Sequence, residues 1–347
     1  MPPSSGPTGG SDTGRRDGSG ATLRDLAAAA GVSVATASRA FSRPEKVDAS
    51  TRERILRLAD DLRYVPNRAA QALITGRTMS LGLMVPDLNN PFFPGVIKGA
   101  QGGARDLGLS LLIGDTDEDP AAELGLVEQL AQRTDAIVLC SSRMPPDDLE
   151  RVARLCPVVL VNREHPGLPA VTFDTDAGVR EAAVHLRALG HRRVGYVGGP
   201  AHSFSDAARA AALHAQFPAH GLDAVMLGNH EPSFEGGRRA ADLVLSSDVT
   251  AVMVHNDVMA LGLVGRLLDY GLDIPRELSV IGWDDIEFAA MFTPGLTTVR
   301  MPREDAGRAA VSYLATALGG RSSEPPCLET HLVFRQTTAR AHRRPTD

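Results

Sequence analysis

Residues 22–41 of the 347-residue chain read TLRDLAAAAGVSVATASRAF, and their pattern predicts the structure of the N-terminal part. Thr22 and Asp25 have the spacing of a capping box, which predicts a short helix directly after Thr22. Gly31 is expected to end that helix, because glycine adopts the left-handed conformation of a C-terminal cap without strain. Ser33 can cap a second helix that runs to the end of the stretch. Two short helices joined by a tight turn predict a helix-turn-helix, whose second helix enters the DNA major groove.

The residues on either side of this pair predict a small helical headpiece over 21–65. Residues 1–20 are rich in Gly, Ser and Pro, and we expect them to form a disordered tail. Ser50 and Glu53 have the spacing of another capping box, which predicts a third helix with apolar positions at Ile55, Leu56, Ala59 and Leu62. Residues 66–78 follow as a hinge helix and linker. This hinge helix is too short to be stable alone, so it should form only when something holds it.

A different pattern begins at residue 80, where short apolar strands alternate with helical stretches. The strands are predicted at 81–85, 110–113, 136–139, 158–161, 194–197, 224–227, 251–254 and 279–281. Such alternation is typical of a doubly wound parallel α/β sheet, and its two runs predict two similar lobes. Polar residues gather at 87–90, 162–163, 255–257 and 284–285, where strands end. We therefore expect a ligand cleft at the carboxyl ends of the strands.

Composition and charge exclude several classes of protein. The apolar runs are too short to span a membrane, and the N-terminus has no apolar block of the kind that signal peptides contain. Three scattered cysteines (Cys140, Cys156 and Cys327) fit a reducing cytoplasm and no disulfide framework or metal site. Residues 21–78 carry ten basic and six acidic residues, whereas residues 79–347 carry 24 basic and 34 acidic ones. A basic N-terminal part followed by an acidic remainder indicates that only the N-terminal part of the chain binds nucleic acid.

Eight motifs in order resemble the lactose-repressor/galactose-repressor family of bacterial transcription factors. They are TLRDLAAAAGVSVATASRAF, VDASTRERIL, YVPNRAAQAL, SLGLMVPDLNNPFF, LRALGHRRVGYVGG, HNDVMALG, SVIGWDDIEFA and PGLTTVRMP. The resemblance covers about residues 22–340. The resemblance implies an all-α headpiece, a hinge helix, and a two-lobed α/β body like a periplasmic sugar-binding protein. The body would span 79–340, with lobes at about 79–173 and 175–298, a C-terminal segment that crosses back, and a tail at 341–347.

The resemblance also implies which residues contact DNA. Val34 and Ala35 would read bases through apolar contacts, and Arg39 would bind guanine or phosphate. Leu73 would insert into the minor groove as an apolar wedge, while Ala70 would let two hinge helices approach closely. The small polar groups suited to phosphate contacts are Thr22, Ser33, Thr36, Ser38, Thr51 and Asn67.

Six residues form the effector site that the resemblance implies: Phe92, Phe93, Arg163, Arg209, Asn256 and Asp284. The phenylalanines would stack on a ring, and the polar groups would form oriented hydrogen bonds. The chain departs from the family in two places. Ala212 and Leu213 replace a Gly-aromatic pair, and Pro232 stands where many members place an aromatic residue, with Phe234 two residues further on.

Structural alternatives stay open for several of these positions. Phe92 and Phe93 could be core residues, and either Asn256 or Asp257 could cap the helix that follows them. Asp285 is expected to form a cap or a salt bridge. The residues His191, Arg192 and Arg193 are expected to form a solvated helix end.

No motif indicates catalysis. The chain lacks a Walker loop, a GxSxG elbow, metal-ligand spacing and a dinucleotide fingerprint, so we expect no cofactor and no metal. We expect a cytoplasmic, dimeric repressor that binds double-stranded operator DNA and responds to a small effector, most simply a sugar. Two alternatives remain: a regulator that a purine or nucleoside activates for DNA binding, and a sugar-binding protein that does not regulate DNA.

Overall fold

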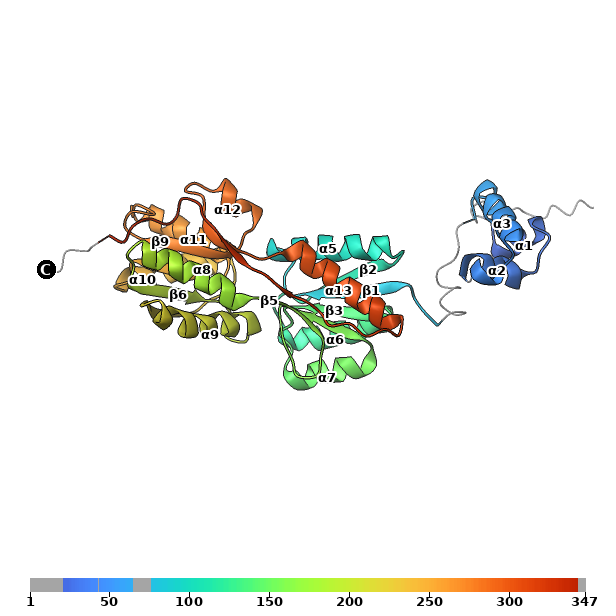
Figure 1. The fold of residues 1–347 in the computed structure, drawn as a ribbon, viewed down its shortest axis with the longest axis horizontal. Coiled ribbons are helices and arrows are strands. Elements are labelled where there is room, and N and C mark those ends of the chain that lie inside the picture. Colours follow the sequence, from blue (N-terminus) through green and yellow to red (C-terminus); the bar gives the residue numbers. More distant parts are fainter. Residues whose placement is uncertain (1–20, 43, 65–75, 343–347) are drawn as a thin grey trace, which may run out of the picture. The chain divides into compact units, whose positions relative to one another are not determined.

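The computed structural model describes residues 21–42, 44–64 and 76–342. The chain divides into two compact units, residues 1–78 and 79–347 (Figure 1). The hinge positions Asn67, Ala70 and Leu73 lie outside the described residues.

The first unit is a three-helix headpiece, with α1 (Leu23–Ala29), α2 (Val34–Ser42), a 3-10 turn η1 (Pro44–Lys46) and α3 (Ala49–Asp61). The predicted capping box is present, because the Asp25 amide donates to Thr22 Oγ1 at 3.3 Å and the Thr22 amide donates to Asp25 Oδ2 at 2.8 Å. Gly31 has a φ of +63°, which explains the glycine in the turn between α1 and α2. The helices bury a small core of Leu26, Ala30, Ala40, Ile55 and Ala59.

The capping box predicted at Ser50 and Glu53 is wrong. Asp48 caps α3 instead, since its Oδ2 accepts hydrogen bonds from the Thr51 amide at 3.2 Å and from the Ser50 hydroxyl at 2.6 Å. A carboxylate is the stronger acceptor, so Ser50 becomes a donor to the cap. Two of the four apolar positions predicted on this helix face the core, whereas Leu56 and Leu62 are each 38% exposed.

The second unit, hereafter the body, has two lobes, each built on a six-stranded sheet. The first sheet has the order β11-β5-β4-β3-β1-β2 and the second β12-β10-β9-β8-β6-β7. The strands are β1 (Ser80–Val85), β2 (Ser110–Asp115), β3 (Ala136–Cys140), β4 (Val158–Val161), β5 (Ala170–Phe173), β6 (Arg193–Gly198), β7 (Asp223–Asn229), β8 (Ala251–Val254), β9 (Ser279–Asp284), β10 (Thr297–Arg300), β11 (Cys327–Leu328) and β12 (His331–Val333). All pairs are parallel except β12 with β10, so the predicted class of parallel α/β lobes is confirmed.

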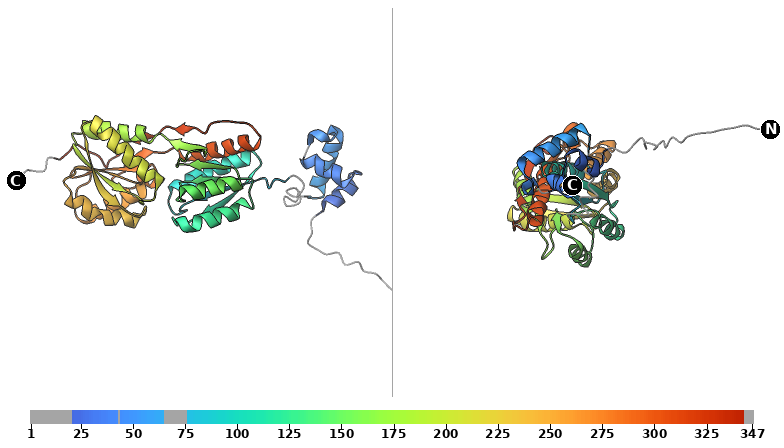
Figure 2. Two further views of the ribbon diagram at one scale, coloured as in Figure 1. Left: turned by 90° about the horizontal axis from the view of Figure 1, so that it is seen from below. Right: turned by 90° about the vertical axis from the view of Figure 1, so that its right-hand side faces the viewer.

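Helices cover both faces of each sheet (Figure 2). Helices α5 and α13 cover one face of the first sheet, and α6 and α7 the other; α8 and α9 face α10 and α11 across the second sheet. Their bounds are α5 (Phe92–Asp106), α6 (Pro120–Ala131), α7 (Pro146–Leu155), α8 (Thr175–Ala188), α9 (Phe204–Ala219), α10 (Phe234–Ser246), α11 (Asp257–Asp269), α12 (Glu287–Met291) and α13 (Arg303–Leu318). None of the helices in the described ranges has the length and apolar character that a membrane span requires.

The chain passes between the lobes three times, after β5, after β10 and after β11. The C-terminal segment returns to the first lobe as α13 and β11, and then adds β12 to the second sheet. Thr330, in the last passage, donates from its hydroxyl to the carbonyl of Asp174, in the first passage, at 2.7 Å. The C-terminal segment therefore completes both sheets and ties two of the passages together.

The prediction of a solvated helix end at His191 is wrong for the histidine. His191 is only 1% exposed, its Nδ1 lies 2.8 Å from Thr250 Oγ1, and its Nε2 lies 3.1 Å from the carbonyl of Ala339. The returning C-terminal segment covers this side chain, whereas Arg192 and Arg193 are exposed as predicted.

Candidate functional sites

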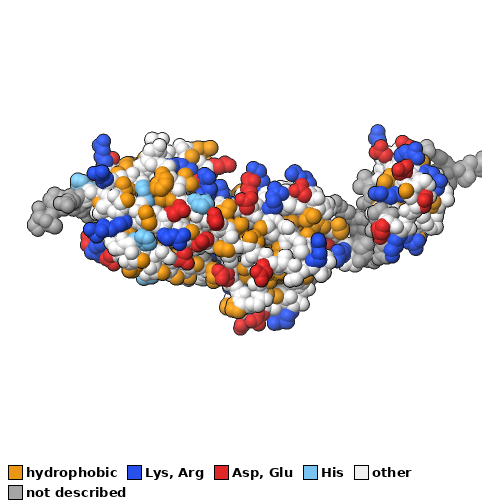
Figure 3. All heavy atoms as spheres, in the orientation of Figure 1, with side chains coloured by type: hydrophobic (Ala, Val, Ile, Leu, Met, Phe, Trp, Pro, Cys, Tyr) orange, Lys and Arg blue, Asp and Glu red, His pale blue; other side chains and the backbone are white. Residues whose placement is uncertain are grey.

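Helix α2 presents the predicted base-reading side chains on its exposed face. Val34, Ala35 and Arg39 are exposed, whereas Ala37 and Ala40 are buried against the other helices. Ser33 Oγ accepts the Thr36 amide at 3.1 Å, so Ser33 caps α2 as predicted. Of the other predicted phosphate-contacting residues within the described ranges, Thr22 is exposed, and Thr36, Ser38 and Thr51 are half-buried. On the face of the body that Figure 3 shows, acidic and basic side chains are interspersed.

A narrow polar cleft lies between the two lobes of the body. The first lobe contributes Asn90, Phe92, Phe93, Glu118, Ser141, Arg143 and Asn162, and the second contributes Ser205, Arg209, Pro232, His255, Asn256 and Asp284. Five of the six predicted effector residues line this cleft. Arg163 lies beside the cleft, where its Nη1 donates to the Ser142 carbonyl at 2.6 Å and its buried Nε has no partner among the described residues.

A buried network in the second lobe surrounds Asp206, in the first turn of α9. The Asp206 carboxylate accepts hydrogen bonds from Tyr196 Oη at 2.7 Å, the Gly199 amide at 2.7 Å and Asn229 Nδ2 at 3.0 Å, and it lies 3.0 Å from His255 Nδ1. Burial alone would raise the pKa of Asp206, but the hydrogen bond and charge of His255, together with the hydrogen bonds from the Gly199 amide and the Tyr196 hydroxyl, lower the pKa to about 2. Burial lowers the pKa of His255 to about 4, so this ring is neutral at pH 7.

Arg209 and Asp284 extend this network into the cleft. Arg209 Nη1 donates to the His255 carbonyl, and the guanidinium lies 4.7 Å from the centroid of the Trp283 ring. Its Nη2 lies 3.8 Å from Asp284 Oδ1, too far for a hydrogen bond. Asp284 is 3% exposed, and its carboxylate accepts no hydrogen bond from the described residues. Burial raises the pKa of Asp284 to about 7, although Arg209 and Arg303 oppose the rise. This carboxylate thus lies at the cleft as an acceptor that is in an ion pair with Arg209 but receives no hydrogen bond from the described residues.

The sequence reasoning missed two charged residues of the cleft, Arg143 and Glu118. Arg143 Nε donates to Glu118 Oε2 at 2.7 Å and Nη2 to Glu118 Oε1 at 3.0 Å. Arg143 Nη1 also reaches Ser203 Oγ of the second lobe at 3.3 Å. Both residues follow strands of the first sheet, β2 and β3. The pattern that indicates them is again a polar residue shortly after a strand, because Glu118 and Arg143 each lie three positions beyond the end of their strand.

Three structural alternatives are confirmed. Asn256 caps α11, because its Oδ1 accepts the Met259 amide at 2.8 Å. Asp285 forms salt bridges with Arg300 at 2.6 Å and with Arg335 at 2.5 Å. Phe92 and Phe93 are each 3% exposed and pack edge to face in the core, although both also line the cleft.

Phe234 lies outside the cleft, and Pro232 faces it in its place. Phe234 is 46% exposed and lines a separate apolar pocket with Leu261, Phe288 and Met291. Within the described ranges, no group of acidic, His or Cys side chains is arranged to hold a metal ion, and the three cysteines are free.

Known proteins match the chain along most of its length. Residues 22–67 match the family described as bacterial regulatory proteins, lacI family, and residues 183–338 match the periplasmic binding protein-like domain. The HTH-type transcriptional regulator GalR of Salmonella typhimurium is 36% identical over 334 residues, which are 93% of this chain and 95% of GalR.

Two solved structures are also similar to the chain. The Lac repressor dimer bound to operator and the anti-inducer ONPF has a TM-score of 0.81 and 28% identity, and the match covers 92% of this chain and 100% of that one. A complex of the transcriptional regulator CelR with cellobiose has a TM-score of 0.67 and 28% identity, and the match covers 91% of this chain and 99% of that one.

Proposed function

Because the chain belongs to the lacI family of bacterial transcriptional regulators, we propose that it represses transcription as a homodimer bound to a pseudo-palindromic operator. It is a DNA-binding regulator with a ligand-binding body, like its relatives, which are regulators and not enzymes. We further propose that a sugar binds in the cleft and thereby changes the affinity of the protein for its operator. One observation carries it: the same chain has an exposed recognition helix and a polar cleft between two lobes.

DNA contact is assigned to α2 and the hinge. Val34 and Ala35 are small and apolar, so they can contact thymine methyl groups but cannot hydrogen-bond to base edges. Most discrimination would then come from Arg39, from the spacing of the two half-sites and from the hinge. In the hinge, Leu73 would act as the wedge that kinks the operator.

An exposed apolar surface on the second lobe supports the homodimer. Phe234, Phe288 and Met291 are 46%, 55% and 72% exposed, and they surround one pocket. Such a cluster is costly in water and is typical of an interface. A two-fold dimer through this surface would present two headpieces, which is why a pseudo-palindromic operator is expected.

The chemistry of the cleft supports a sugar as effector. Asp284 and Glu118 offer carboxylate acceptors, and Arg209 and Arg143 offer donors, which are the groups that orient sugar hydroxyls. The cellobiose complex of CelR is a sugar complex on the same fold. A sugar that favours one arrangement of the lobes would shift the operator-binding equilibrium, and a hundredfold shift requires about 2.7 kcal/mol of differential affinity.

The test combines DNA selection with ligand screening. Full-length protein is used to select operators from random DNA, and variant protein without residues 1–78 serves as the control that should lose all sequence-specific binding. Thermal shift of the body with a panel of sugars, purines and nucleosides then identifies the effector class, because a ligand stabilises the state that it binds. Stabilisation by a nucleoside that also tightens operator binding would favour the purine or nucleoside alternative. Specific binding that survives removal of the headpiece would refute the DNA assignment.

A further inference from the structure

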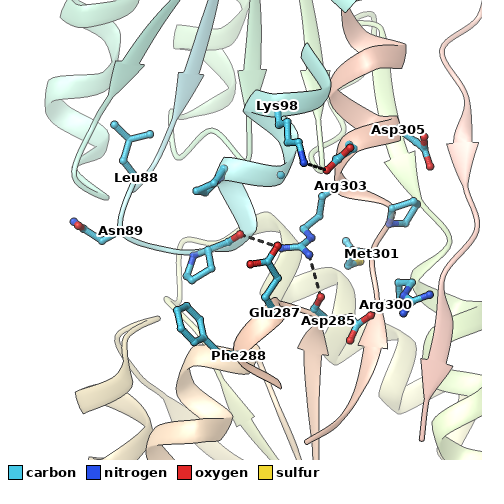
Figure 4. A pocket seen from close by; sticks show the side chains of 15 residues that line it. Leu88, Asn89, Lys98, Asp285, Glu287, Phe288, Arg300, Met301, Arg303 and Asp305 are labelled. Atoms are coloured by element: carbon cyan, nitrogen blue, oxygen red, sulfur yellow. Dashed lines mark hydrogen bonds and ion pairs between the residues drawn. The ribbon is translucent and has the colours of Figure 1, made fainter. Parts of the chain in front are cut away.

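Arg303, the first residue of α13, contacts both lobes through one guanidinium group (Figure 4). Its Nη1 donates to the carbonyl of Pro91 at 3.0 Å, and its Nη2 donates to the carbonyl of Asp285 at 3.0 Å. Pro91 precedes α5 in the first lobe, whereas Asp285 follows β9 in the second. The group lies in the wall of a pocket of about 520 Å³ that is separate from the effector cleft. A single side chain therefore bridges the lobes beside the proposed ligand site.

The segment that Arg303 holds has a strained backbone. Asp284 has a φ of +117° and Asp285 a φ of +55°, and residues other than glycine rarely adopt such backbone angles. A conformation of this kind persists only where its surroundings fix it. The Asp285 carboxylate is fixed by Arg300 and Arg335 of the second lobe, and the Asp285 carbonyl is fixed by Arg303. Arg303 makes the one contact in this set that comes from the first lobe.

Backbone contacts continue from this turn to Arg303. The Met301 amide donates to the Asp284 carbonyl at 3.4 Å, and the Arg303 amide donates to the Met301 carbonyl at 2.8 Å. On the first lobe, a side chain at Gly95 of α5 would place its Cβ 3.0 Å from the Arg303 Cβ, so the glycine leaves room for Arg303. The position of Asp284 is thus linked through Arg303 to the start of α5.

We propose that Arg303 is a positioning residue of the effector site: it holds the turn at Asp284 and Asp285 against the start of α5 and so directs the Asp284 carboxylate into the cleft. This inference rests on the proposed function, in which Asp284 accepts a hydroxyl of the sugar. The planar fork of the guanidinium is required, because its two Nη atoms are held apart and reach carbonyls of different lobes, whereas the donors of a lysine ammonium all lie on one compact nitrogen.

The chain supplies a spectroscopic probe and a matched control. Trp283 is the only tryptophan of the sequence, it is 1% exposed, and it directly precedes Asp284. Arg308 lies on the same helix as Arg303, but it pairs with Asp106 of α5 at 3.2 Å, entirely within the first lobe. Replacing Arg308 therefore removes an arginine contact of α13 and leaves the bridge between the lobes intact.

The experiment compares full-length wild type with R303M, R303K and R308M, first without ligand. We expect Trp283 emission of R303M to move to longer wavelength and the amides of Asp285 and Ile286 to exchange roughly tenfold faster, which corresponds to about 1.4 kcal/mol of local opening. R303K is expected to behave like R303M, and R308M like wild type. Wild-type emission and exchange in R303M, or equal changes in R303M and R308M, would overturn the inference.

A binding measurement separates this inference from the proposed function. Wild type is titrated with D-galactose, D-ribose and cellobiose, and any sugar that binds is expected to bind R303M about tenfold more weakly and R308M unchanged. Equal affinity of wild type and R303M would overturn the role of Arg303. If none of the three sugars binds wild type, the choice of these sugars as effectors fails, and the emission and exchange data alone decide whether Arg303 positions the turn.

Discussion

Replacing Asp284 by Asn should stabilise the body at alkaline pH while it weakens effector binding. The Asp284 carboxyl is nearly buried and has a pKa of about 7, against 3.8 for an ordinary aspartate. The folded state therefore holds this proton more tightly than the unfolded state does. Consequently the free energy of unfolding falls as the pH rises from below 3.8 through 7. Asparagine has similar size, tolerates a positive φ and carries no charge to desolvate.

The magnitude follows from the two pKa values. A difference of one between the pKa values of the folded and unfolded states corresponds to about 1.4 kcal/mol. Full ionisation of Asp284 at pH 8 therefore costs the folded body up to about 4 kcal/mol, and at pH 5 the cost is smaller because the folded carboxyl is still protonated. D284N should thus be more stable than wild type at pH 8 by about 2–4 kcal/mol, with a smaller gain at pH 5.

The assay is urea denaturation followed by Trp283 fluorescence at pH 5, 6.5 and 8. Asp285 offers a neighbouring control of opposite sign, because its carboxylate pairs with Arg300 and Arg335. D285N should therefore lose on the order of 1–3 kcal/mol at pH 8. If wild type and D284N lose the same stability between pH 5 and pH 8, the argument from the buried carboxylate is refuted.

Three further substitutions test the packing, the headpiece and the hinge. In G262A the new Cβ would lie 1.9 Å from the Phe234 carbonyl oxygen, so α10 and α11 must separate. The urea midpoint should therefore fall by an amount equivalent to about 1–3 kcal/mol. An unchanged midpoint would contradict this close packing. T22A removes the capping hydroxyl that accepts the Asp25 amide, and hydrogen exchange of the α1 amides should report a loss of about 1 kcal/mol in helix stability. Unchanged exchange would show that the cap is dispensable. L73A should bind the selected operator more weakly and bend it less in gel-mobility assays; equal bending would exclude the wedge.

Local sequence patterns predicted the elements that local interactions determine. The capping box at Thr22, the glycine turn at Gly31 and the serine cap of α2 all depend on residues within four positions of one another. Eight of the twelve strands of the body were predicted, because most buried parallel strands are continuous apolar runs. The sequence analysis did not predict β5, β10, β11 and β12, which are two to four residues long. The prediction for α3 failed within the same range, because the helix begins two residues earlier. Asp48 takes the capping position and accepts both the Thr51 amide and the Ser50 hydroxyl.

The parts that could not be predicted depend on residues far apart in the sequence. His191 is buried because Ala339 returns to it, and nothing near residue 191 indicates that contact. Arg303 and Pro91 are likewise joined across 212 positions. Polar residues at strand ends indicated where the cleft lies, and the resemblance then selected six individual residues. Neither named Glu118 or Arg143, whose pairing depends on the first sheet having formed.

The late strands of the body have a consequence for its synthesis. Residues 327–328 add an edge strand to the first sheet and residues 331–333 add one to the second. On the ribosome, neither lobe can complete its sheet until almost the entire body has emerged, whereas the headpiece has all of its helices by residue 61. Folding of the effector-binding body is therefore complete only after residue 333 has left the ribosome, and a nascent chain displays a finished DNA-reading helix before it has any means of controlling it.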